Sequence, residues 1–127
     1  MLEVSPELII KIHREAIVYG GSDEQSLRDA IRDEGCLPAI CFGDFSDDPF
    51  VRAAYYLHRI STRHPFVEGN KRTAFLTAAY ILSKDGGCRI VEDVRENNGF
   101  VRSVAAGNTC EEEIEVWLRA HVTHSVP

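Results

Sequence analysis

Hydrophobic residues recur at intervals of three and four along most of the chain, a pattern typical of amphipathic helices. Near the amino end, Ser5 and Pro6 are residue types favoured at a helix cap and at the first helical position. The apolar positions that follow at helical spacing are Leu8, Ile9, Ile12, Ala16 and Ile17. Gly20 and Gly21 predict the end of this first helix, because glycine readily adopts the backbone conformation of a helix stop.

The middle of the chain predicts two long helices joined by a short loop. One helix is expected to start after Asp48, at Pro49, and to end near Arg63. Its apolar face is predicted to carry Val51, Ala54, Tyr55 and His58, with His58 packed in the core. The other helix is expected to start with Asn70 as its cap residue and to end at Gly86 and Gly87. Its apolar positions, which predict a buried central helix, are Phe75, Ala78, Ala79 and Leu82.

The remaining segments predict shorter elements. Residues 23–40 predict one or two helices interrupted near Gly35 and Pro38. Residues 88–91 predict an extended piece, and residues 93–106 predict another helix. Thr109 and Glu112 have the spacing of a capping box for a last helix. That helix carries Ile114, Trp117, Leu118 and His121, and the pair His121 and His124 is assigned to a solvated tail.

Together these elements predict an all-α protein, a compact bundle of about six helices in a single domain over residues 1–127. At 127 residues, with 44% hydrophobic and 27% charged residues, the chain has the size and composition of one globular domain. The net charge of −6 argues against binding to nucleic acid or to an anionic membrane. No apolar stretch reaches the roughly 18 residues of a membrane span, so we expect a cytoplasmic protein.

The four cysteines, Cys36, Cys41, Cys88 and Cys110, include no C-x-x-C pair, so a zinc site is not indicated. The candidate chemistry lies instead in residues 64–74, which read HPFVEGNKRTA. If this segment leads into a helix, the free N–H groups of the first turn and the positive end of the helix dipole attract an anion. Gly69 allows the backbone to approach a ligand closely.

The side chains of this segment have the types needed for phosphoryl or nucleotidyl transfer. His64 is suited to accept a proton near neutral pH. Glu68 offers the hard oxygen ligands that hold Mg²⁺ together with substrate phosphates. Lys71 and Arg72 oppose the helix dipole, a conflict that a bound phosphate would remove. Each residue taken alone also has an ordinary structural role, but their confinement to nine positions favours a phosphate site.

The string at residues 64–74 resembles the signature of the Fic/Doc family, written HPFx(D/E)GNGRxxR in Fic enzymes and HxFx(D/N)(A/G)NKRTA in Doc toxins. The resemblance extends from about Val4 to Val122. It includes SPELIIKIHREAIVYGG at residues 5–21 and IRDEGCLPAI at residues 31–40. It implies a Fic/Doc-like helical fold whose active loop lies between two central helices.

The resemblance also implies roles for individual residues. His64 would be the base that deprotonates the target hydroxyl, and Glu68 would hold Mg²⁺ against the phosphates of ATP. The anion-binding loop and helix start would be formed by Gly69, Asn70, Lys71 and Arg72. Phe66 would be the hydrophobic anchor of the loop.

Two positions bear on which phosphate is transferred. Lys71 stands where Fic enzymes have glycine, and Phe75 stands where they have a second arginine. Doc toxins share both changes, which favours a kinase that transfers the γ-phosphate to a Thr or Ser of a translation factor of the elongation factor Tu type. A Fic-like AMP transferase and a catalytically silent antitoxin-binding module are the alternatives.

The resemblance to Doc toxins further implies a type II toxin-antitoxin system that inhibits translation, with a Phd-like antitoxin as partner. The self-inhibitory S/T-x-x-x-E/G-N motif of some Fic proteins has no counterpart here, because residues 22–25 and 109–113 lack its asparagine. Inhibition is therefore expected to come from a separate chain.

Overall fold

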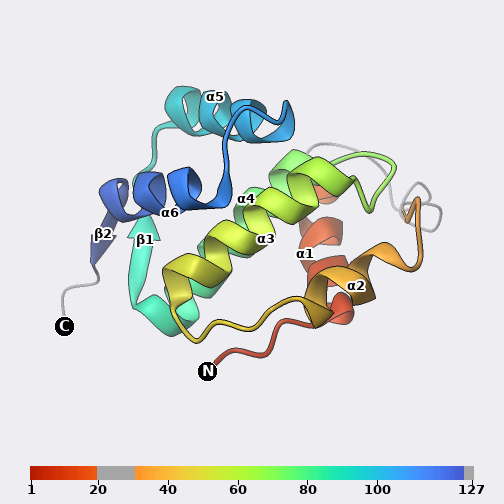
Figure 1. The fold of residues 1–127 in the computed structure, drawn as a ribbon. Helices are drawn as coiled ribbons and strands as arrows, with labels where there is room; N and C mark the ends of the chain where they lie inside the picture. Colours follow the sequence, from red (N-terminus) through yellow and green to blue (C-terminus); the bar gives the residue numbers. More distant parts are fainter. Residues whose placement is uncertain (20–30, 125–127) are drawn as a thin grey trace.

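The computed structural model describes residues 1–19 and 31–124. They form six α-helices and a two-stranded antiparallel sheet (Figure 1). The helices are α1 (Pro6–Tyr19), α2 (Cys36–Phe42), α3 (Pro49–Arg63), α4 (Asn70–Gly86), α5 (Val94–Ala105) and α6 (Glu111–Ala120). The strands are β1 (Cys88–Ile90) and β2 (Val122–His124). The prediction of an all-α protein is confirmed.

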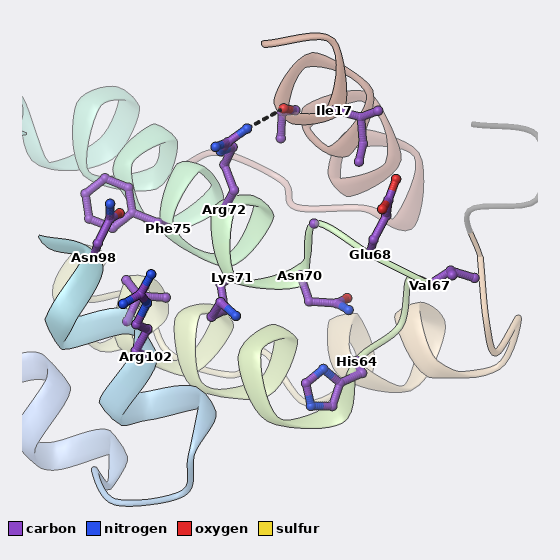
Figure 2. Close-up of a pocket in the computed structure, with 13 residues that line it drawn as sticks. Ile17, His64, Val67, Glu68, Asn70, Lys71, Arg72, Phe75, Asn98 and Arg102 are labelled. Carbon is purple, nitrogen blue, oxygen red and sulfur yellow. Dashed lines mark hydrogen bonds between the residues drawn. The ribbon is translucent and has the colours of Figure 1, made fainter. Parts of the chain in front are cut away.

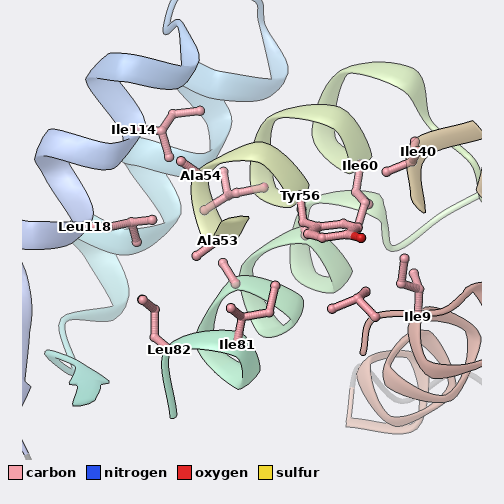
Figure 3. Close-up of a cluster of buried hydrophobic side chains, with 14 of the residues drawn as sticks. Ile9, Ile40, Ala53, Ala54, Tyr56, Ile60, Ile81, Leu82, Ile114 and Leu118 are labelled. Atoms are coloured by element: carbon pink, nitrogen blue, oxygen red, sulfur yellow. The ribbon is translucent and has the colours of Figure 1, made fainter. Parts of the chain in front are cut away.

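Helices α3 and α4 form the central pair of the bundle, running in opposite directions on either side of the loop at residues 64–69 (Figure 1). Helix α1 packs against α4, and α2 packs against α1 and α3. Helices α5 and α6 pack against the central pair from the other side. The buried side chains between these layers form one continuous hydrophobic core (Figure 3).

Local signals set most of the helix boundaries. The hydroxyl of Ser5 accepts a hydrogen bond from the backbone N–H of Leu8, 3.1 Å away, at the start of α1. The carboxylate of Asp48 accepts from the N–H of Phe50 at 2.8 Å and caps α3. Gly87, with φ of 60°, ends α4 in the left-handed conformation expected of a glycine stop.

Two sequence predictions about the helices are corrected, and one cannot be compared with the structure. The last helix is capped by Cys110, whose capping box includes Glu113, one residue later than predicted. Thr109 is buried instead and bonds to Ser103. Helix α2 runs through Pro38, because a proline in the first helical turn removes no hydrogen bond of the helix. The predicted stop at Gly20 and Gly21 lies outside the described residues, as does the first part of residues 23–40.

The buried face of α3 also differs from the prediction. Of the four residues predicted to face the core, only Ala54 is buried, whereas Val51, Tyr55 and His58 are half-buried. The residues of α3 that are buried are Arg52, Ala53, Ala54, Tyr56, Leu57, Ile60 and Ser61. The apolar pattern alone could not indicate this face, because the face includes the charged residue Arg52, which is buried together with carboxylate partners.

The carboxyl end of the described chain is also more ordered than predicted. Strand β2 pairs with β1, with Cys88 opposite His124 and Ile90 opposite Val122. His121 is not in a solvated tail: its ring stacks on Trp117 at 4.1 Å, and its Nε2 lies 2.7 Å from a carboxylate oxygen of Glu96. No helix in residues 1–19 or 31–124 combines the length and apolar character that crossing a membrane requires.

A buried ion pair network ties the central helices to the loop before α3. Arg52 is only 3% exposed, and its guanidinium donates to both carboxylate oxygens of Asp44 and to Asp85 at 3.0 Å. The hydroxyl of Tyr56 also donates to Asp44, at 2.8 Å. Because a buried charge is costly without its partners, this network fixes α3 and α4 relative to each other at the end remote from the 64–69 loop.

We expect Asp44→Asn to lower the free energy of unfolding by about 3 kcal/mol, because it leaves the buried guanidinium of Arg52 with an incomplete set of anionic partners. Urea unfolding followed by circular dichroism measures this change. Arg119→Gln is the matched control, since Arg119 pairs with Asp48 at the surface, and should cost less than about 1 kcal/mol. Equal effects of the two substitutions would contradict a special role for the buried network.

Candidate active site

His64 caps the carboxyl end of α3 in the left-handed conformation, with φ of 51° and ψ of 62°. This conformation is uncommon for a residue with a side chain, so it must be held by its surroundings. Arg32 provides that support, because its Nε donates to the carbonyl of His64 at 2.8 Å and its Nη2 donates to the carbonyl of Arg63 at 2.9 Å. The His64 side chain is thereby directed into the cavity beside the loop (Figure 2).

Helix α1 holds the loop at residues 64–69 in place through contacts of His13. Phe66 is 1% exposed, and its ring stacks on that of His13 with 3.8 Å between centroids and 7° between planes. The Nε2–H of His13 donates to the carbonyl of Glu68 at 2.9 Å. On the other side, the N–H of Arg32 donates to the carbonyl of Pro65 at 2.8 Å. The backbone of the loop is therefore held from two directions.

Asn70 closes the loop on itself rather than capping the helix, which corrects the sequence prediction. The cap position of α4 is occupied by Gly69, and no side chain bonds to the helix start. The buried carboxamide of Asn70 accepts from the N–H of Phe66 at 3.0 Å and donates to the carbonyl of Phe66 at 2.9 Å. Both polar groups of Phe66 are satisfied in this way without water.

The amino end of α4 is open to a ligand. The first backbone bond of the helix runs from Thr73 N–H to the carbonyl of Gly69. The N–H groups of Asn70, Lys71 and Arg72 therefore have no partner within the helix. Gly69 has φ of 77°, and a Cβ there would lie 3.0 Å from Ile17. The position thus requires glycine both for its backbone conformation and for the close approach of α1.

All six residues predicted to form the site line one cavity of about 630 Å³ (Figure 2). They are His64, Glu68, Gly69, Asn70, Lys71 and Arg72. Further walls come from Ala16 and Ile17 of α1 and from Asn98, Val101 and Arg102 of α5. The structure therefore joins the predicted loop to two elements that lie far from it in sequence.

The cavity carries a local excess of positive charge in an acidic protein. Its described lining includes the cations Lys71, Arg72 and Arg102 and a single carboxylate, that of Glu68. One nitrogen of Arg72 donates to the carbonyl of Ala16 at 3.2 Å, in the last turn of α1, which links α1 to the start of α4. This combination of open N–H groups and cationic side chains suits a polyanion such as a nucleotide phosphate chain.

Glu68 fits a Mg²⁺ ion held jointly by protein and substrate. Its side chain is exposed and lines the cavity on the α1 side of the loop (Figure 2). Within residues 1–19 and 31–124, no three His, Cys, Asp or Glu side chains gather as a metal cage. One carboxylate together with substrate phosphates is, however, a common way for proteins to bind Mg²⁺.

Two residues considered from sequence have other places in the structure. Phe75, in α4, is half-buried and lines the cavity, so it provides an apolar part of the cavity wall. His58 is half-buried outside the cavity lining, beside Arg59, so the prediction of a fully packed core histidine is wrong. Burial lowers the pKa of His58, and the neighbouring Arg59 lowers it further.

Three contributors to the site were missed by the sequence analysis. His13 lies on the apolar face of α1, three residues before Ala16 and four after Ile9, and this position could have indicated burial. Arg32 and Arg102 had no such signal, because each reaches the site from a distant segment. Their roles follow from tertiary packing alone.

The geometry defines an all-α protein whose cavity brings a histidine and a carboxylate together at an uncapped helix start. A sequence model of the Fic/DOC family matches residues 3–82, which is more than half of the chain. The chain therefore belongs to the Fic/DOC family. No curated protein sequence matches it. Members of this family are often transferases, and they generally bind ATP with Mg²⁺.

The buried ring of His13 predicts a pH dependence of stability. Burial lowers its pKa below the usual 6.5, although the carbonyl and the charge of Glu68 raise it in part. Below about pH 6.5 the unfolded chain gains a proton that the folded His13 does not, so stability falls as the pH falls. We expect His13→Gln to remove part of this loss, on the order of 1 kcal/mol between about pH 7 and pH 5.

Urea unfolding at a series of pH values measures the effect. His58→Gln is the control, because the pKa of His58 is also lowered but its ring does not contact the loop. Only His13→Gln should also reduce protection of the backbone amides of the loop in hydrogen exchange. The same pH dependence in His13→Gln and wild type would refute this account of His13.

Proposed function

We propose that this protein is a Doc-type protein kinase that transfers the γ-phosphate of ATP to a Thr or Ser hydroxyl. The observation that carries the proposal is the shared cavity, in which His64 and the open start of α4 face the same space. A base and an anion-binding backbone in one cavity are what transfer from a nucleotide to a hydroxyl requires.

In the proposed reaction, His64 acts on the target hydroxyl, and the start of α4 binds the nucleotide phosphates. His64 takes the proton of the target hydroxyl as its oxygen forms a bond to the γ-phosphorus. The bond between that phosphorus and the bridging oxygen breaks, and ADP leaves with the electron pair. Phosphoryl transfer requires little covalent chemistry from the protein, so positioning of the reactants and neutralisation of charge account for most of the rate enhancement.

The residues present fit ATP and Mg²⁺. The N–H groups at the start of α4, the side chains of Lys71 and Arg72, and the close backbone at Gly69 would hold the phosphates. Glu68 would hold the Mg²⁺, which when bound neutralises phosphate charge. Phe75 and Val101 offer an apolar wall to the nucleoside.

The residues at positions 71 and 75 support a kinase over an AMP transferase. A flexible ammonium group at Lys71 places a point charge where Fic enzymes leave open space, and Phe75 offers no cation to a distal phosphate. AMP transfer is the second candidate, favoured by the Glu68-Gly69 pair, which also occurs in the Fic form of the motif. The intact His64 and Glu68 argue against a catalytically silent antitoxin-binding module.

The Doc-like motif also supports a role as the toxin of a type II toxin-antitoxin system. Its target would be a translation factor of the elongation factor Tu type, and modification of that factor would inhibit translation in the cytoplasm. A Phd-like antitoxin would supply inhibition in trans. The absence of the self-inhibitory motif from the sequence is consistent with such a separate partner.

Labelled ATP separates the candidate reactions. We expect purified protein incubated with cell lysate and Mg²⁺ to transfer label to protein from γ-labelled ATP and not from α-labelled ATP. Label from α-labelled ATP alone would replace the kinase with the AMP transferase. No label from either form, with ATP binding retained, would favour the silent module.

His64→Ala tests the proposed base. We expect the variant to lose transfer by at least a hundredfold, as removal of a general base does, while its affinity for ATP changes less than about twofold, because His64 contacts the nucleophile and not the phosphates. Isothermal titration and the γ-label assay measure the two quantities. Expression of wild type should slow growth and expression of His64→Ala should not; full activity of the variant would refute the assignment.

A further inference from the structure

The wall that α5 contributes to the cavity carries a cation outside the sequence motif. Arg102 lies in the last turn of α5 and lines the cavity together with Asn98 and Val101. Its side chain is exposed and forms no ion pair or hydrogen bond with any residue in the described ranges 1–19 and 31–124. Within these described ranges, the guanidinium of Arg102 is therefore available to a ligand in the cavity.

Lys71 faces the same part of the cavity from α4. Figure 2 shows the side chain of Lys71 pointing away from that of Arg72, in the space between the side chains of Arg102 and His64. Lys71 likewise has no ion pair with another described side chain, and the carboxylate of Glu68 lies on the opposite side of the loop in this view. Two cations that share a cavity without an acidic partner repel each other, and an anion bound between them removes this repulsion.

The position of this pair relative to His64 indicates which part of a substrate it meets. In Figure 2, Lys71 stands between His64 and Arg102. In transfer to a hydroxyl, the attacking oxygen and the leaving oxygen lie roughly in line on opposite sides of the phosphorus. With the attacking hydroxyl at His64, the leaving group extends away from His64 and along the cavity.

We propose that Arg102, together with Lys71, binds the phosphate groups that depart with the leaving group of the nucleotide. This inference rests on the proposed function, but it holds for either candidate reaction. Attack at the γ-phosphorus releases ADP, and attack at the α-phosphorus releases pyrophosphate. In both, the bridging oxygen takes the electron pair of the broken bond, and Arg102 neutralises the negative charge that develops there.

The test is titration of wild type and Arg102→Ala with two probes, ATP and inorganic tripolyphosphate, each with Mg²⁺. We expect the substitution to weaken binding of both probes about tenfold, as the loss of a hydrogen-bonded charge pair does. Arg95→Ala is the matched control, because Arg95 lies in the first part of the same helix, is exposed and does not line the cavity. It should leave both affinities unchanged, and thermal unfolding checks that each variant is folded.

The outcomes distinguish this inference from the proposed function. Unchanged affinities in folded Arg102→Ala would overturn the role of Arg102 while leaving the kinase proposal standing. Weaker binding of ATP with unchanged binding of tripolyphosphate would also overturn it, because Arg102 would then contact the nucleoside. Failure of wild type to bind either probe would overturn both proposals.

Discussion

The conformation of the loop at residues 64–69 is the constraint on which the rest of the site depends. The carboxamide of Asn70 satisfies both backbone polar groups of Phe66, and the ring of Phe66 stacks on His13. These contacts are buried, so water does not compete for them and their hydrogen bonds are strengthened. The start of α4 follows from this arrangement, and the hydrogen bonds from Arg32 to the carbonyls of Arg63 and His64 then direct the His64 side chain into the cavity.

The central pair α3 and α4 supplies a rigid support for that loop. At one end the two helices are joined by the loop itself, and at the other they are joined through Arg52 and its carboxylate partners. Between these points the pair is packed through apolar side chains such as Ile60 and Ile81 (Figure 3). A site placed on helices fixed at both ends keeps its geometry better than one built on mobile loops.

The sequence predicts the parts of this protein that depend on neighbouring residues. The cap at Asp48, the stop at Gly87 and the motif at residues 64–74 were found because their determinants lie within a few positions of one another. Contacts between distant segments could not be found in this way. The stacking of His13 on Phe66 and the ion pair between Arg52 and Asp85 each join residues more than thirty positions apart. Hydrophobic periodicity could not indicate that Arg52 is buried, because it carries no information about a carboxylate on another element.

The cavity combines a local motif with walls from α1 and α5, and this separation in sequence has a consequence for folding. The loop contacts between Phe66 and Asn70 span four positions, so they form with little loss of chain entropy. Bringing α1 and α5 to the cavity instead requires closure of much longer stretches of chain. A nascent chain that had emerged only as far as residue 82 would contain the whole motif but no α5 wall. The complete cavity should therefore form only after α5 has been synthesised and has docked on the central pair.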